Sequence, residues 1–194
     1  MHISLRRSER AGTAHTRGPR SRRGPLMSAD GDGRIVVRPA QRDDVPLLHF
    51  FIKALAEYEH LSHEVVADEA GLAQALFGER PVAEAVIAEW DGTAAGFCLF
   101  FSTFSTFVGR AGIYVEDLFV VPEMRGRGIG KALLGHVARL AVERGCGRLE
   151  WSVLDWNRPA IEFYERAGAR ALDEWTMYRL AGDALVRFAG SVDD

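Results

Sequence analysis

Long hydrophobic runs and cysteines are both scarce in this chain of 194 residues. No stretch reaches the length of about 18 consecutive apolar residues, so the sequence predicts no membrane-spanning helix. The only cysteines are Cys98 and Cys146. Two cysteines cannot staple a domain of this size, which favours a reducing, cytoplasmic environment. With 47% hydrophobic and 26% charged residues and no internal repeats, the composition is typical of one globular domain.

Acidic residues are almost absent from the first 26 residues, which contain seven arginines and one acid, Glu9. The remainder then has 17 basic and 26 acidic residues, a net charge of −9. We expect residues 1–33 to be a disordered leader, or to include a misassigned start, since Met27 opens an ordinary N-terminal sequence. A nucleic-acid-binding arm and a targeting peptide are the alternatives. A single domain at 34–181 and a C-terminal tail at 182–194 are expected to follow.

Hydrophobic periodicity predicts alternating strands and helices in the rest of the chain. The Asp91-Gly92 pair predicts a tight hairpin between two of the strands. The expected order, β-α-α-β-β-β-α-β-α-β, indicates an α/β fold with one mixed sheet flanked by helices. The expected strands are 34–40, 83–90, 94–104, 112–121, 148–154 and 174–180, and the expected helices are 41–60, 69–78, 127–145 and 157–168.

A glycine-rich, basic stretch, MRGRGIGKAL at 124–133, joins an expected strand to an expected helix. The unpaired N–H groups and the dipole at a helix start favour a phosphate. The stretch is no Walker A loop, because Arg125 and Ala132 stand where glycine and serine or threonine are needed, and Lys131 breaks the dinucleotide fingerprint. Glycine at such positions costs about 0.5–1 kcal/mol relative to alanine, which a mere connection has little reason to carry. We therefore predict a pyrophosphate-binding turn rather than a turn with solvated charges.

The pattern Arg-x-x-Gly-x-Gly, read at Arg125, Gly128 and Gly130 after a strand ending in VVP, resembles the acetyl-CoA signature of the GNAT N-acetyltransferases. A series of stretches over residues 35–180 resembles, in order, the diamine acetyltransferases of the spermidine/spermine and thialysine type: LAEYEHL, FGERP, AGFCLFF, YVEDLFV, WNRPAIEFYERAGA and a closing EWTMYRL. The resemblance implies a GNAT fold with a sheet splayed at its middle and a homodimer. It also implies acetyl transfer from acetyl-CoA to the primary amine of a small cationic acceptor by direct attack, with no metal.

The same resemblance assigns the site residues. Asn157 would contact the pantetheine arm, and Tyr164 would lie beside the thioester sulfur as a catalytic acid. Their separation of two helical turns lets both face one ligand; packing of Tyr164 in the core is the alternative. Backbone groups along the strand end and the turn would bind acetyl-CoA, at Phe119, Val120, Val121, Arg125, Gly126, Arg127, Gly128, Ile129, Gly130 and Lys131.

Two acids, Glu116 and Asp117, interrupt an otherwise apolar expected strand. Burying them is costly unless they are paired or used. An amine acceptor of pKa about 10 arrives protonated, so a nearby carboxylate can hold the cation and take its proton. The resemblance assigns Glu116 as the catalytic base and both acids to acceptor binding. Adjacent side chains of a regular strand point to opposite faces, so both reach one site only if the strand bulges, as the family's strand does. A local bulge or a strand edge that exposes both acids to solvent is the alternative.

Several functional alternatives stay open from the sequence. The same fold acts on other amines, such as an amino acid, an antibiotic or a protein N-terminus, and a CoA-binding module without turnover is a further possibility. The acids around the end of the first expected helix form either a solvated face or an entrance for a polycation: Glu57, Glu59, Glu64, Asp68 and Glu69.

Overall fold

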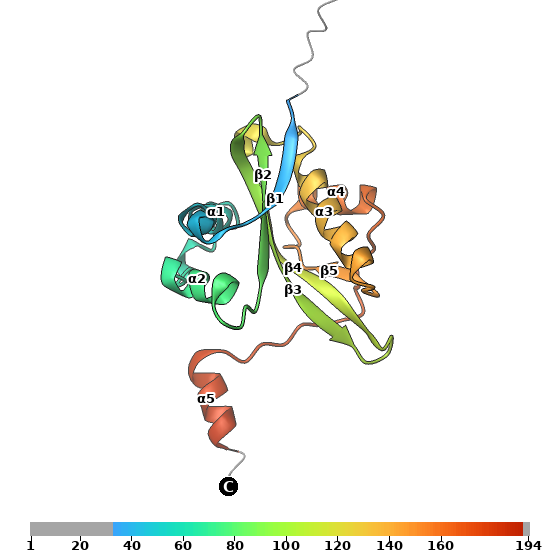
Figure 1. Cartoon of the computed structure of the whole chain (residues 1–194). Coiled ribbons are helices and arrows are strands. Elements are labelled where there is room, and N and C mark those ends of the chain that lie inside the picture. Colours follow the sequence, from blue (N-terminus) through green and yellow to red (C-terminus); the bar gives the residue numbers. More distant parts are fainter. Residues whose placement is uncertain (1–32, 192–194) are drawn as a thin grey trace, which may run out of the picture. The chain divides into compact units, whose positions relative to one another are not determined.

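A five-stranded mixed sheet forms the centre of the fold in the computed structural model, which describes residues 33–191 (Figure 1). The strands lie in chain order, β1-β2-β3-β4-β5, and neighbours are antiparallel except for the parallel pair β4 and β5. The predicted mixed sheet with flanking helices is confirmed. The strands are β1 Ile35–Pro39, β2 Glu84–Trp90, β3 Thr93–Ser105, β4 Arg110–Val120 and β5 Leu149–Trp151, and the helices are α1 Val45–Tyr58, α2 Glu69–Phe77, α3 Ile129–Glu143, α4 Arg158–Arg166 and α5 Gly182–Gly190.

Local sequence signals explain several of these boundaries. The β2–β3 hairpin turns at Asp91 and Gly92, whose φ angles of 49° and 78° are those that a tight hairpin requires. Asp68 caps α2 by accepting a hydrogen bond from the Gly71 N–H at 2.7 Å. Gly145, just past α3, takes a left-handed φ of 67°, as glycines after helices commonly do.

The helices cover both faces of the sheet, α1 and α2 on one side and α3 and α4 on the other (Figure 1). On the α1 side, Phe51 packs between Phe97 of β3 and Phe119 of β4, with ring centroids 5.8 and 5.9 Å apart. On the α3 side, Leu133 and Val137 are fully buried against the sheet. These two cores fix α1 and α3 against the middle strands, where the candidate site lies.

The C-terminal part of the chain differs from the sequence expectation. The strand expected at 148–154 is reduced to the three residues of β5, and the strand expected at 174–180 does not form. A strand needs a neighbouring backbone to pair with, and none lies beside 174–180 in the described single chain. A helix that was not expected, α5, occupies most of the predicted tail.

Two further expectations, on the leader and on membrane-spanning helices, can be compared with the structure only within residues 33–191. The proposed leader falls almost entirely outside the described residues. Within residues 33–191, no helix is both long and apolar enough to cross a membrane.

Candidate active site

The glycine-rich turn lies at the N-terminus of α3, where the sequence predicted it. Gly126 and Gly128 have φ angles of 76° and 83°, a region in which other residues are strained. A Cβ added at Gly126 would meet no atom within 4 Å, so the space above the turn is open. No side chain caps the helix at Gly128, and the Ala132 N–H is the one that bonds the Gly128 carbonyl. The N–H groups of the first turn are therefore not used by the helix and, with its dipole, favour an anion.

β4 contains a bulge at its two acidic residues. Val115 and Asp117 pair with consecutive residues of β3, so Glu116 is an extra residue in the strand. Before the bulge Val115 packs in the α3-side core, whereas after it Phe119 packs in the α1-side core. Asp117 shares the face of Phe119, and the Glu116 side chain is exposed to solvent. The bulge that both acids would need to reach one site is present, and it aims the Asp117 carboxylate towards α1.

β4 and β5 pair over only three residues on each strand. Within residues 33–191, no strand lies beside the rest of β4 on that side. Because the Val121 N–H bonds the Ala95 carbonyl on β3, the backbone groups of Val120 face the open side. The Val120 carbonyl accepts a hydrogen bond of 3.1 Å from Arg125 Nε. The opening is thus bordered by a free strand edge and by the first arginine of the glycine-rich turn.

Three carboxylates influence one another at this opening. Burial raises the pKa of Asp117 to about 7, and the negative charges of Glu116 and Glu59 add to the shift. The Asp117 carboxyl is therefore partly protonated near neutral pH. Glu59 lies at the C-terminal end of α1, and burial raises its pKa as well. Among the described residues, none of the three forms an ion pair, so their charges are available to a cation.

Tyr164 and Asn157 are both held on α4. Asn157 is buried and caps the helix, accepting a hydrogen bond of 3.4 Å from the Ala160 N–H. Tyr164 packs with ring centroids 4.9 Å from Trp151 of β5 and 5.2 Å from Phe163. Burial raises the pKa of the Tyr164 phenol to about 12, and the nearby Cys98 and Glu59 contribute. The phenol therefore keeps its proton at physiological pH and lies within reach of the Glu59 charge.

The end of α1 also belongs to the site. From the sequence its acids, Glu59 among them, are either a solvated face or a polycation entrance, and Tyr58 was not anticipated. The Tyr58 hydroxyl donates a hydrogen bond of 3.2 Å to Asn157 Oδ1. The Arg125 guanidinium lies over the Tyr58 ring, with Cζ 4.4 Å from the ring centroid. Trp156 also packs against Tyr58, with the ring centroids 5.9 Å apart. The run LAEYEHL contains Tyr58 and Glu59, but their contacts with α4 and β4 are tertiary and no local spacing encodes them.

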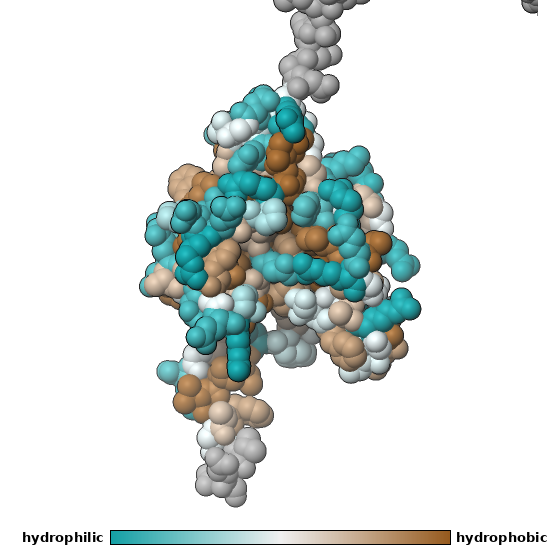
Figure 2. Space-filling model, viewed as in Figure 1, coloured by the Kyte–Doolittle hydropathy of each residue, from teal (hydrophilic) through white to brown (hydrophobic). Residues whose placement is uncertain are grey.

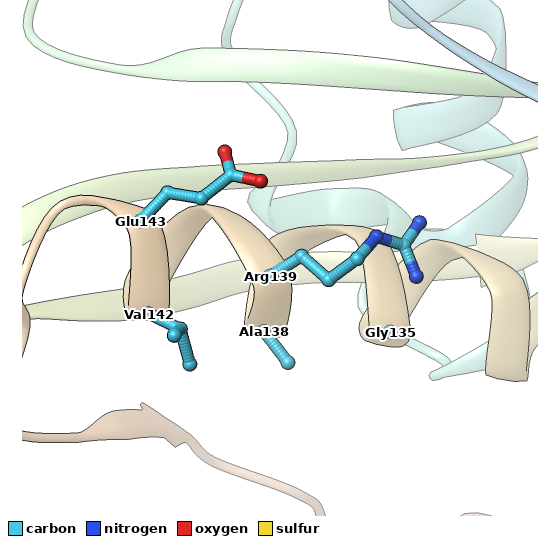
Figure 3. A pocket seen from close by; sticks show the side chains of 5 residues that line it. All are labelled: Gly135, Ala138, Arg139, Val142 and Glu143. Atoms are coloured by element: carbon cyan, nitrogen blue, oxygen red, sulfur yellow. The ribbon is translucent and has the colours of Figure 1, made fainter.

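A hollow of about 290 Å³ lies apart from these residues, on the exposed side of α3 (Figure 3). It is lined by a single helix and contains none of the predicted site residues. Figure 3 shows Arg139 and Glu143 extending along the helix rather than converging on one point. The hollow is not part of the candidate site. Its lining residues are Gly135, Ala138, Arg139, Val142 and Glu143.

Comparison with known proteins matches residues 49–169 to the acetyltransferase (GNAT) family, a range that contains every site residue described above. The chain is 38% identical over 167 residues to a thialysine N-epsilon-acetyltransferase of Sus scrofa, covering 80% of this chain and 98% of that protein. It is 35% identical over 194 residues to an L-ornithine N5-acetyltransferase of Arabidopsis thaliana, covering 77% of this chain and 85% of that protein.

Solved structures show the same fold. An integron cassette protein of V. cholerae superposes with a TM-score of 0.67 at 28% identity, covering 80% of this chain and 97% of that one. An aminoglycoside acetyltransferase from a soil metagenomic sample has a TM-score of 0.65 at 16% identity, covering 76% and 96%. The second likeness is one of fold alone.

Proposed function

This chain belongs to the acetyltransferase (GNAT) family and is an N-acetyltransferase, and we propose that its acceptor is the primary amine of a small cationic molecule of the diamine, polyamine or thialysine type. The observation that carries the proposal is the group of three carboxylates, Glu59, Glu116 and Asp117, which form no ion pair within residues 33–191, with Glu59 near the Tyr164 phenol. Such a group attracts a cation and offers both a proton acceptor and a proton donor. The thialysine and ornithine relatives act, by name, on molecules with such an amine.

Acetyl-CoA, the co-substrate of the family, would supply an activated thioester to this site. The residues fit such a group at the turn, where unused N–H groups and open space above Gly126 suit a pyrophosphate. Asn157 would orient the pantetheine arm, and no metal is proposed to take part. The backbone groups proposed to bind acetyl-CoA are those of Phe119, Val120, Val121, Arg125, Gly126, Arg127, Gly128, Ile129, Gly130 and Lys131.

The acceptor amine must lose a proton before it attacks. We assign Glu116 as the base, because it is the bulged residue of β4 and its carboxylate is exposed to solvent. Asp117 would hold the cation from the α1 side. The Tyr164 hydroxyl would hold the proton that the departing thiol takes up, and its raised pKa keeps that proton on the phenol at neutral pH. A covalent acyl-enzyme is not proposed, since Cys98 is buried and its thiol pKa is raised by that burial.

We further propose that the enzyme is a cytoplasmic homodimer without a nucleic-acid partner. Both cysteines, Cys98 and Cys146, are free, which suits a reducing compartment. The residues after position 26 carry a net charge of −9, which repels a phosphate backbone.

A thiol-release assay with a panel of amines tests the proposal. Acetyl-CoA is offered with thialysine, L-ornithine, spermidine and tyramine, and each acetylated product is identified by mass spectrometry. We expect one of the cationic aliphatic amines to give the highest kcat/KM. The control is the rate without acceptor. If no amine raises thiol release above that rate, the proposal is contradicted. If tyramine is preferred, the proposed class of acceptor is wrong but the acetyl transfer stands.

A further inference from the structure

Two arginines of the glycine-rich turn, Arg125 and Arg127, each lie over an aromatic ring. Arg125 lies over Tyr58 of α1. The Arg127 guanidinium lies over Trp90, the last residue of β2, with Cζ 5.2 Å from the ring centroid. Neither arginine forms an ion pair with a residue in the part of the chain that the structure describes. Because an aromatic face attracts a guanidinium without neutralising it, both arginines keep their full charge for an anion.

The surroundings of Arg127 explain why its partner is a ring. The two acids that flank Trp90 in the chain, Glu89 and Asp91, already accept hydrogen bonds. Glu89 accepts one of 2.7 Å from the Arg38 side chain, and Asp91 accepts one of 2.8 Å from a backbone N–H just before β1. β1 itself exposes hydrophobic surface, which Figure 2 shows in brown. The Trp90 ring is therefore the group at this end of the sheet that attracts the guanidinium.

The Trp90 ring is held firmly beside the turn. Trp90 is half-buried and packs against the α3-side core. Its backbone pairs with Ile35 of β1 and Thr93 of β3. A Cβ added at Gly128 would lie 3.9 Å from Ile35 Cδ1, so the end of β1 borders the turn as well. The strands thus fix the ring at one side of the turn, and the ring in turn holds a long, flexible arginine side chain there.

We infer that Trp90 is a positioning residue for acetyl-CoA, because it holds the Arg127 guanidinium where this group meets the pyrophosphate. The inference rests on the proposed function, since it concerns the same co-substrate. The start of a helix supplies only partial positive charge, whereas a guanidinium supplies a full charge and several donors. Arg127 stands between the left-handed Gly126 and Gly128, so its backbone and its side chain act on one ligand. An arginine already ordered by a ring loses less conformational entropy when the ligand binds.

Calorimetric titration of the full chain with CoA, which carries the same pyrophosphate as acetyl-CoA, tests the inference without an assay of activity. Trp90→Leu removes the ring face, and we expect the Kd for CoA to rise about two- to fivefold. Trp90→Phe keeps a ring and should lose less affinity. Arg127→Gln should raise the Kd about tenfold or more.

The double variant separates positioning from a structural role. If Trp90 acts through Arg127, adding Trp90→Leu to Arg127→Gln should cause no further loss of affinity. A loss of the same size in the Arg127→Gln background would mean that Trp90 only supports the fold, and it overturns the inference. Dephospho-CoA keeps the pyrophosphate but lacks the ribose phosphate, so it should show the same losses. Losses confined to CoA overturn the assignment to the pyrophosphate.

Two matched controls lie away from the turn. Phe77→Leu removes a contact of the same kind, in which Arg42 Cζ lies 5.9 Å from the ring centroid. Arg139→Gln removes the same charge from an exposed position further along α3. Both should leave the Kd for CoA unchanged, and an equal rise for Arg139→Gln would assign the effect of Arg127 to net charge and overturn the inference.

The titrations also separate this inference from the proposed function. A wild-type chain that does not bind CoA overturns the proposed function and the inference with it. A wild-type chain that binds CoA, with a Kd that neither Trp90→Leu nor Arg127→Gln changes, overturns the inference alone.

Discussion

The Tyr58 hydroxyl at the end of α1 donates a hydrogen bond to Asn157, the buried cap of α4. The two residues are 99 positions apart in the chain. Since Arg125 lies over the same tyrosine ring, one side chain joins the glycine-rich turn, α4 and α1. Tyr58 therefore positions two of the groups proposed to bind acetyl-CoA.

Tyr58→Phe removes this hydrogen bond and keeps the ring under Arg125. We expect a loss of about 0.5–1.5 kcal/mol in the free energy of unfolding and a several-fold rise in KM for acetyl-CoA, because Asn157 loses its orienting partner. Thermal unfolding and steady-state kinetics measure the two effects. Thr106→Val, which removes an exposed hydroxyl in the turn between β3 and β4, is the control and should change neither. An unchanged KM would remove Tyr58 from the site.

Gly128→Ala tests the turn at α3. At a φ of 83° an added Cβ is strained by about 1–2 kcal/mol, so stability should fall and the anion-binding geometry should be lost. Gly145→Ala carries the same kind of strain at a φ of 67° just past the other end of α3. Both variants should unfold at lower temperature, but only Gly128→Ala should raise KM for acetyl-CoA. Equal kinetics in the two variants would argue against a binding role.

Glu116→Gln removes the proposed base at constant volume. A general base contributes about 10²–10⁴ in rate, so kcat/KM for the amine should fall within that range while KM for acetyl-CoA stays constant. Glu79→Gln, at an exposed acid after α2, serves as the control. If Glu116→Gln kept full turnover between pH 7 and 9, another group would have to take the proton of the acceptor amine.

Asp117→Asn tests the raised pKa through stability. Folding favours the protonated carboxyl, so the stability that Asp117 contributes is complete below its unfolded pKa, near 4, and is lost as pH rises through about 7. The wild type should therefore be less stable than Asp117→Asn at pH 8, by on the order of a few kcal/mol at most, and the difference should vanish near pH 4. Thermal unfolding of both proteins across this range measures it. A difference that does not vary with pH would mean that Asp117 does not titrate there.

Tyr164→Phe removes one oxygen and keeps the ring packed against Trp151 and Phe163. If the phenol supplies the proton to the leaving thiol, kcat should fall ten- to a thousandfold, about 1.4–4 kcal/mol of transition-state stabilisation. KM for acetyl-CoA and the unfolding temperature should change little. Turnover retained with every acceptor would return Tyr164 to a purely structural role.

Sequence patterns predicted the features that local chemistry determines. The helix α3 was predicted from its hydrophobic periodicity and the turn before it from its glycines, whereas a bulge at the two acids was recognised only as the condition under which both reach one site. The role of Tyr58 could not be predicted, since its partners are distant in the chain and meet only in the folded state. The strand at 174–180 failed for a different reason: its sequence favours extension, but pairing requires a second backbone that one folded chain does not bring to it.

The bulge at Glu116 makes the site sensitive to the length of β4 rather than only to its composition. Deleting Glu116, the extra residue, would restore the regular alternation of the strand and leave Asp117 on the face of Phe119. Deleting Leu118 instead would keep both acids but turn Asp117 to the α3-side core, where Leu118 packs. Homologous chains that keep both acids but lack the extra residue would therefore present a different acceptor surface, and the residue count of this strand is a criterion for sorting relatives by substrate.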